Sequence, residues 1–136
     1  MGTKELLRRY YDEVWEKGNV EAIDELVAED YVDHTPPPGG DASRESLRLI
    51  ARYFAERAKE TRLELRMLVA DGDAGAGFWE MEWVHTGDFF GAPADGKRLT
   101  MKGADLFVVR DGRIAETWHT EAVLEVFGQL GMTPKP

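Results

Sequence analysis

The hydrophobic period of the chain changes once, near Thr61, and this change limits the possible folds more than any other feature of the sequence. Before it, apolar residues recur at helix spacing: Leu6, Leu7, Tyr10, Tyr11, Val14 and Trp15, then Leu47, Ile50, Phe54 and Ala58. After it, apolar residues alternate with charged ones: Leu63, Leu65, Met67 and Val69 alternate with Arg62, Glu64 and Arg66. A period of about 3.6 indicates a helix and a period of about 2 a strand. The chain is therefore predicted to be an α+β protein, with N-terminal helices packed on one face of a curved antiparallel sheet.

Three helices are predicted in the first half of the chain. Thr3 is a plausible N-cap of the first helix, which ends at Gly18. Asn19 can cap a short second helix, and Ser43 caps the third. Between the second and third helices, residues 35–40 contain three prolines and two glycines. Such a segment cannot be a helix or a central strand, so it is predicted to be a rigid loop.

Four strands and a closing helix are predicted in the second half. The alternating runs 62–69 and 79–85 are the first two strands, and the others extend from about 99 to 109 and from about 113 to 119. A final helix is expected to end at Gly131. Its predicted inward residues are Val123, Leu124, Phe127 and Leu130.

Length and composition exclude several classes of protein. A chain of 136 residues fits one domain, 1–136, with a real core. The net charge of −9 argues against a nucleic-acid partner, because phosphate binding needs clustered cations. No apolar run is long enough for a membrane span, and the charged N-terminus does not resemble an export signal. With no cysteine there is no disulfide or thiolate metal site, and a cytoplasmic location is the default expectation.

The hairpin at 111–112 decides whether Asp105 and His119 share a face of the sheet. A two-residue Asp-Gly loop would put them on opposite faces. A three-residue loop would pair Val109 with Arg113 and make Asp105 and His119 diagonal neighbours, about 7–8 Å apart at Cα. We favour the three-residue loop, because a carboxylate on an apolar face needs a partner.

An Asp–His pair in a partly dry pocket has acid–base capacity. The carboxylate of Asp105 would orient the His119 imidazole and raise its pKa. A neutral imidazole could then remove a proton next to a carbonyl group and return it later. The alternative is purely structural: the two residues satisfy each other, or Arg52 or Arg98 pairs with Asp105.

Other residues are candidates for the wall of the same pocket. His85 either lines the pocket or caps its strand, and His34 lies at the mouth of the proline-rich loop. The full set of predicted ligand-binding residues is His34, His85, Trp83, Tyr53, Trp79, Met101, Phe107 and Thr117. The histidines and acids do not match metal-ligand spacing, so no metal site is predicted.

The chain resembles the SnoaL-like polyketide cyclase group of the nuclear-transport-factor-2-like superfamily along nearly its whole length. The residues that carry the resemblance are Tyr31-Val32-Asp33-His34, His85-Thr86-Gly87-Asp88-Phe89-Phe90-Gly91, Pro93, Gly96-Lys97, Gly103-Ala104-Asp105-Leu106-Phe107, Asp111-Gly112-Arg113-Ile114, Trp118 and Gln129-Leu130-Gly131. The resemblance implies a cone of helices wrapped by a curved sheet, one internal pocket, and a homodimer formed through the outer sheet face.

The resemblance also implies a chemistry. Characterised cyclases of the group close a ring by intramolecular aldol chemistry without cofactor or metal, using an acid–base pair on the two strands that match this hairpin. As we align the chain, their His falls at Asp105 and their catalytic Asp at His119, so the two residue types are exchanged here.

Three functions fit these expectations. The first is a cofactor-independent enzyme that moves protons on a small, mostly apolar carbonyl compound, with His119 as general base or acid and Asp105 orienting it. The second is a non-catalytic binder of a small hydrophobic ligand. The third is a hydrolase of epoxides or esters, which would need an arginine beside Asp105 to position water.

Overall fold

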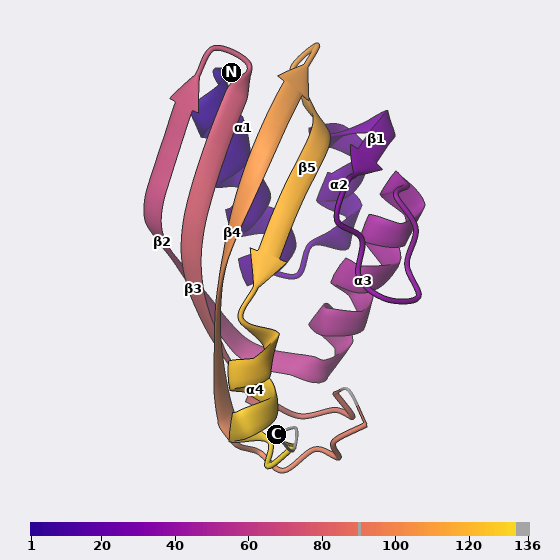
Figure 1. The fold of residues 1–136 in the computed structure, drawn as a ribbon, viewed down its shortest axis with the longest axis vertical. Helices are drawn as coiled ribbons and strands as arrows, with labels where there is room; N and C mark the ends of the chain where they lie inside the picture. Colours follow the sequence, from indigo (N-terminus) through magenta and orange to yellow (C-terminus); the bar gives the residue numbers. More distant parts are fainter. Residues whose placement is uncertain (90, 133–136) are drawn as a thin grey trace.

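A computed structural model of the protein describes residues 1–89 and 91–132. Phe90, which belongs to a motif quoted above, and the end of the predicted domain, 133–136, lie outside the described residues. Five strands form one sheet in the order β1-β5-β4-β3-β2 (Figure 1). Their bounds are β1 Val27–Asp33, β2 Ala58–Asp71, β3 Ala74–His85, β4 Arg98–Arg110 and β5 Arg113–Glu121.

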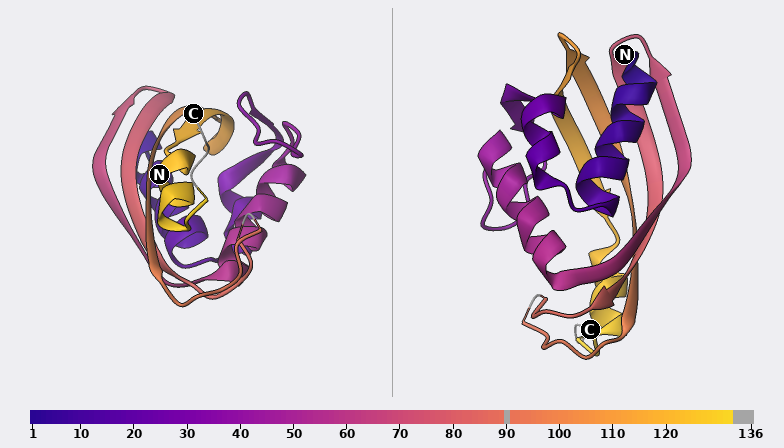
Figure 2. Two further views of the ribbon diagram at one scale, coloured as in Figure 1. Left: turned by 60° about the horizontal axis from the view of Figure 1, so that its bottom comes forward. Right: turned by 180° about the vertical axis from the view of Figure 1, so that it is seen from behind.

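Helical segments cover one face of this sheet. They are α1 Thr3–Tyr10, the π-helix η1 Tyr11–Glu16, the 3-10 helix η2 Val20–Ala22, α2 Ile23–Leu26, α3 Arg44–Arg57 and α4 Val123–Gln129. Figure 2 shows α1, α2 and α3 together on one side of the sheet, which curls around them, and α4 at one end. The predicted α+β fold, with N-terminal helices on a curved and mostly antiparallel sheet, is confirmed.

Strand β1 was not predicted from the sequence. It pairs in parallel with β5, with Asp33 opposite Thr117. Its burial does not alternate strictly, because Val27 and Ala28 are both buried and Glu29 and Asp30 are both exposed. A strand without a period of two gives no signal by alternation.

The predicted helix caps are partly right. Ser43 caps α3, since its side chain accepts a hydrogen bond from the backbone N–H of Ser46. Thr3 is not a cap: its hydroxyl donates to the carbonyl of Gly72 at 2.8 Å, and it lies inside α1. Asn19 makes no side-chain cap either, and its amide nitrogen donates to Glu13.

The predicted register of the β4–β5 hairpin is wrong. The turn has two residues, Asp111 with φ 54° and Gly112 with φ 75°, and Arg110 pairs with Arg113. A bulge then adds Ala115 to β5 and shifts the register by one residue. Asp105 therefore lies directly opposite His119, so both share one face although the loop is the shorter of the two alternatives.

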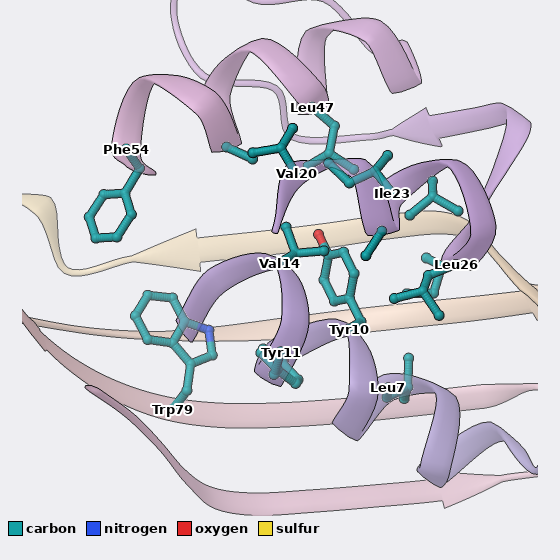
Figure 3. Packing of buried hydrophobic residues seen from close by; sticks show 14 of the residues in the cluster. Leu7, Tyr10, Tyr11, Val14, Val20, Ile23, Leu26, Leu47, Phe54 and Trp79 are labelled. Atoms are coloured by element: carbon teal, nitrogen blue, oxygen red, sulfur yellow. The ribbon is translucent and has the colours of Figure 1, made fainter. Parts of the chain in front are cut away.

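The core lies between the concave face of the sheet and the helices. Figure 3 shows Tyr10 and Val14 pointing from the first helical segments toward Val20, Ile23 and Leu47, with Tyr11 and Trp79 on the side of the sheet. In α4 the predicted inward face is partly wrong: Leu124 is exposed and Val126 is fully buried. None of the helices in the described part of the chain is long and apolar enough to cross a membrane.

Candidate active site

Asp105 and His119 face the helices from the concave side of β4 and β5. Together with Glu121 they present side-chain oxygen and nitrogen atoms that all lie within 4.8 Å of one another. All three are partly buried. The prediction that Asp105 and His119 share one face is therefore correct, although the three-residue turn on which it rested is not the turn observed.

The imidazole of His119 is held between two carboxylates. Nδ1 lies 2.6 Å from Glu121 Oε1, and Nε2 lies 2.9 Å from Asp33 Oδ2. The hydrogen bond to Glu121 and the charges of both carboxylates outweigh burial and raise the pKa of His119 to about 9. With two acceptors and a raised pKa, His119 is an imidazolium at neutral pH and donates both of its N–H groups.

The carboxyl group of Asp105 is bound through one oxygen only. Oδ2 accepts a hydrogen bond of 2.5 Å from the Tyr11 hydroxyl and one of 2.9 Å from Trp79 Nε1. Oδ1 accepts none from any described residue. Burial raises the pKa of Asp105 to about 6, while the bonds from Tyr11 and Trp79 and the charge of His119 act in the opposite direction. The Asp105 carboxyl group is thus mostly ionised at neutral pH, and its pKa lies only slightly below that pH.

Two glycines make room for the donors to Asp105. A Cβ on Gly77, the cross-strand partner of Asp105, would lie 2.4 Å from the Tyr11 hydroxyl. A Cβ on Gly103, the partner of Trp79, would lie 2.4 Å from the Trp79 ring. These close approaches require glycine at both positions.

The π-helix η1 begins at Tyr11. Tyr11 and the preceding Tyr10 are both buried, and both rings contact Phe107 edge-on. Single π-helical turns occur often at functional sites. Burial, followed by the neighbouring Asp105, raises the pKa of Tyr11, so its hydroxyl stays protonated and remains a donor.

Three of the predicted wall residues lie near the pair, and the fourth, Met101, lies four residues before Asp105 on β4. Trp79 bonds to Asp105, and Phe107 is buried against Tyr11. Thr117 is buried and bonded through its hydroxyl to Tyr31 at 2.6 Å. Met101, on β4, is partly buried against the core.

The other predicted wall residues lie elsewhere. His34 is exposed, bonds to Glu116, and stacks on Trp118 with 4.3 Å between ring centroids. Tyr53 is 37% exposed on α3 beneath Arg57. Trp83 and His85 are fully buried farther along β3. His34 was expected to lean over a cavity because it lies at the mouth of the proline-rich loop, but its backbone N–H bonds to the carbonyl of Thr117 and its side chain is exposed.

An arginine partner for Asp105 was a sequence-based alternative, and it is wrong for the residues described. Arg98 pairs with Glu60 and Glu82, and Arg52 is exposed on α3. All hydrogen bonds of Asp105 come from neutral donors. The arrangement expected for an epoxide or ester hydrolase is therefore not present among these residues.

Two surface hollows are present, and the second of them is lined in part by Tyr11, the residue that donates to Asp105. One, of about 410 Å³, is between the start of β1 and the tip of the β4–β5 hairpin, and the other, of about 470 Å³, is between α1 and β2. Neither is lined by Asp105 or His119. The rings of Tyr11 and Trp79 lie against the carboxyl group instead. Solvent reaches the site from the side of His119 and Glu121, whose side chains are 19% and 28% exposed.

The cluster of Asp105, His119 and Glu121 is also the group best able to hold a divalent metal. Its donor atoms are already engaged, since both nitrogens of His119 and one oxygen of Asp105 carry hydrogen bonds. A metal ion would have to replace those hydrogen bonds to bind here. The absence of a metal site therefore remains a prediction.

Sequence reasoning missed three residues of this site. Tyr11 was assigned to the core, Glu121 was not considered, and Asp33 was noted only within the motif Tyr31–His34. Glu121 continues the alternation of Thr117 and His119 on β5, so a strand extended by two residues would have placed it beside His119. No local signal links Asp33 or Tyr11 to the hairpin.

Comparison with known proteins identifies the family of the chain. The SnoaL-like polyketide cyclase profile matches residues 5–130. A proposed polyketide cyclase from Acidithiobacillus ferrooxidans has a similar structure, with 28% sequence identity and a TM-score of 0.82 over 97% of this chain and 96% of that one. IdmH, a proposed polyketide cyclase from Streptomyces antibioticus, has 26% identity and a TM-score of 0.83 over 96% and 99%.

A more distant structure supports the fold alone. AclR, a proposed hydroxylase from Streptomyces galilaeus, has 19% identity and a TM-score of 0.86 over 97% of each chain. No curated protein sequence matched the chain. Because the family profile covers most of its length, the chain belongs to the SnoaL-like polyketide cyclase family, with the nuclear-transport-factor-2-like fold of that family.

Proposed function

We propose that the protein is a cofactor-independent enzyme that transfers protons on a small, mostly apolar carbonyl compound, in the manner of a polyketide cyclase. One observation carries the proposal. The Asp105 carboxyl group is fixed through Oδ2 by Tyr11 and Trp79, leaves Oδ1 free of hydrogen bonds to described residues, and lies beside a cationic His119. Membership of the family supports the substrate class.

The electrostatics favour Asp105 over His119 as the proposed base. A general base must be unprotonated, and His119 is charged up to about pH 9. Asp105, with its pKa raised to about 6, is ionised at pH 7 yet more basic than an ordinary carboxylate. This reverses the roles expected from the sequence, where a neutral His119 was the first choice.

The proposed reaction begins when Asp105 Oδ1 takes a proton from the carbon next to the substrate carbonyl. The C–H electron pair becomes the enolate, and its negative charge is stabilised by the nearby imidazolium of His119. The enolate carbon then attacks a second carbonyl of the same molecule, forming a C–C bond and an alkoxide. The proton on Asp105 returns to that alkoxide, so the sum is an isomerisation that needs no external reactant.

The first step can be tested before the natural substrate is known. Acetophenone, a small apolar ketone, exchanges its methyl protons slowly in D₂O, and proton NMR follows this exchange. We expect the protein to accelerate exchange and the Asp105→Asn variant to lose the acceleration, by about 10²–10⁴-fold for a true base. Asp111→Asn, at the exposed hairpin tip, is the matched control. Exchange that is unaccelerated, or equal in both variants, would remove Asp105 from this role.

A non-catalytic binder of a small hydrophobic molecule is the second candidate. It is favoured by the engagement of both ring nitrogens of His119, which leaves neither N–H free for a substrate. A binder returns its ligand unchanged, so mass spectrometry of a bound ligand before and after incubation separates the two candidates.

We also propose that the protein forms a homodimer through the convex face of the sheet. Val69, Ala76, Leu106 and Trp118 are cross-strand neighbours in one row over four strands. Leu106 and Trp118 are 56% and 37% exposed. An apolar row of this kind is typical of an interaction surface. Analytical ultracentrifugation should show a dimer that Leu106→Lys converts to a monomer, whereas Leu124→Lys, at an exposed residue on α4, should not.

A further inference from the structure

Two buried polar atoms on the concave face of β3 have no hydrogen-bond partner among the described residues: Trp83 Nε1 and His85 Nδ1. Both side chains are 0% exposed. A buried polar group without a partner costs about 1–3 kcal/mol, so an unpaired donor and acceptor close together call for an explanation. These residues take no part in the Asp105–His119 site.

The hydrogen bonding of His85 defines what each atom offers. His85 Nε2 lies 2.9 Å from the carbonyl oxygen of Pro93, which can only accept, so Nε2 carries the proton. In a neutral ring Nδ1 is then an acceptor, and Trp83 Nε1 is always a donor. The two residues are successive inward positions of one strand, about 7 Å apart at Cα. The interior therefore presents one free donor and one free acceptor on successive inward-facing residues of β3.

An aromatic ring from the loop between β3 and β4 fills the space beside them. Phe89 is 4% exposed, and its ring centroid lies 5.7 Å from that of Trp83 and 6.3 Å from that of His85. Phe54 of α3 lies 6.1 Å from the same ring. Phe89 begins a tight turn closed by two backbone hydrogen bonds with Ala92, so it belongs to the loop and not to the sheet.

We propose that Trp83, His85 and Phe54 form a subsite for a phenolic ring, and that Phe89 fills this subsite when no ligand is bound. The ligand ring takes the place of the Phe89 ring. Its hydroxyl oxygen accepts from Trp83 Nε1, and its hydrogen is donated to His85 Nδ1, so one hydroxyl satisfies both orphan atoms. A phenol supplies the flat apolar ring and the donor–acceptor group together, which a plain hydrocarbon or a ketone does not.

The subsite also gives a length for the substrate of the proposed enzyme, and this part rests on the proposed function. Trp79, which bonds to Asp105, and Trp83 are four residues apart on β3, or about 13 Å along the strand. A fused polycyclic phenol could extend from the subsite to Asp105. Phenol binding itself does not require proton transfer, so the two proposals can fail separately.

The test uses phenol and benzene as a matched pair of probes on the Phe89→Ala variant, which vacates the subsite. Isothermal titration calorimetry should show phenol binding about ten-fold or more tighter than benzene, because two hydrogen bonds depend on the hydroxyl. In the Phe89→Ala background, Trp83→Phe should reduce this preference to about three-fold or less. Phe78→Ala, on the outer face, is the control and should bind neither probe.

A second measurement on the unmodified protein covers the case in which Phe89→Ala does not fold. Phenol should shift the ¹H–¹⁵N signal of the Trp83 indole and the ¹⁵N signal of His85 Nδ1, at concentrations that leave the circular dichroism spectrum unchanged. Equal affinity of the variant for phenol and benzene would overturn the proposal. So would a folded variant that binds neither probe, or unmoved signals in the unmodified protein when the variant does not fold. Failure of acetophenone exchange alone would leave the phenol subsite standing.

Discussion

Asp105 and His119 are direct cross-strand partners, yet the side chain of each makes its hydrogen bonds with other residues. His119 is held by Asp33 and Glu121, and Asp105 by Tyr11 and Trp79. The carboxylates raise the pKa of His119, and burial raises the pKa of Asp105. The pair is therefore a cation beside a weakly basic carboxylate, with the two pKa values moved apart.

Asp105→Asn should abolish activity and stabilise the fold. Burial raises the pKa of Asp105 from 3.8 to about 6, so the stability present below pH 3.8 is lost as the pH rises through about 6. Asparagine avoids this loss and keeps an oxygen for Tyr11 and Trp79. Urea denaturation at pH 7 should show a gain of about 1–2 kcal/mol. A variant that is less stable at pH 7 would contradict the assigned burial cost.

The stability of the protein should fall as the pH rises from about 6.5 to about 9. His119 has its pKa raised from 6.5 to about 9 in the folded state, so its contribution is complete below pH 6.5 and is lost through pH 9. Urea denaturation at several pH values should show a loss of about 1–3 kcal/mol that is absent from His119→Gln. His34→Gln, at an exposed histidine, should retain the loss. If the stability of His119→Gln fell with pH as steeply as that of the unmodified protein, the loss would have to come from other groups.

The rate of the proposed enzyme should have a bell-shaped pH profile. The rate rises as Asp105 ionises through about pH 6 and falls as His119 loses its proton through about pH 9. Tyr11→Phe removes a hydrogen bond that lowers the Asp105 pKa, so its acidic limb should move to higher pH. Tyr53→Phe, on the exposed side of α3, should leave both limbs in place. The measurement is the rate of acetophenone proton exchange across pH.

Gly103→Ala should destabilise the protein by about 1–3 kcal/mol through overpacking. The added Cβ would lie 2.4 Å from the Trp79 ring and 2.8 Å from the carbonyl oxygen of Thr120. Gly2→Ala is the matched control, since a Cβ there would meet no atom within 4 Å. Thermal unfolding followed by circular dichroism compares the two. An equal melting temperature would mean that Trp79 moves aside, in which case its hydrogen bond to Asp105 should also be lost.

Chelation of divalent metals should leave the exchange rate and the melting temperature unchanged. The proposed reaction uses only side chains, and the donor atoms of His119 and Asp105 carry hydrogen bonds. Dialysis against EDTA, with elemental analysis of the protein before and after, makes the measurement. Activity that disappears with EDTA and returns with one metal would show that Asp105, His119 and Glu121 are ligands.

Local sequence features predicted most of the secondary structure. The alternation after Thr61 corresponds to β2 and β3, and Ser43 caps α3 as expected. Features that depend on strand pairing were harder to predict from the sequence. Strand β1 forms by pairing with β5, and no local sequence pattern marks the bulge at Ala115. Asp105 and His119 lie an even number of positions apart in the sequence, and the prediction that they share a face used this spacing. The two-residue turn and the one-residue bulge together have the same effect on the pairing as the predicted three-residue loop.

The amino-acid sequence by itself determined the order of helices and strands and the placement of one carboxylate and one imidazole on a common hairpin. Only the tertiary structure decided which neighbours set the pKa of each group. Tyr11 is 94 residues from Asp105, and Asp33 is 86 residues from His119. Protonation depends on neighbours within a few ångströms, and those neighbours come from η1 and β1. Folding alone brings such distant segments to one place, so the pKa shifts of the two groups could not be predicted from the hairpin.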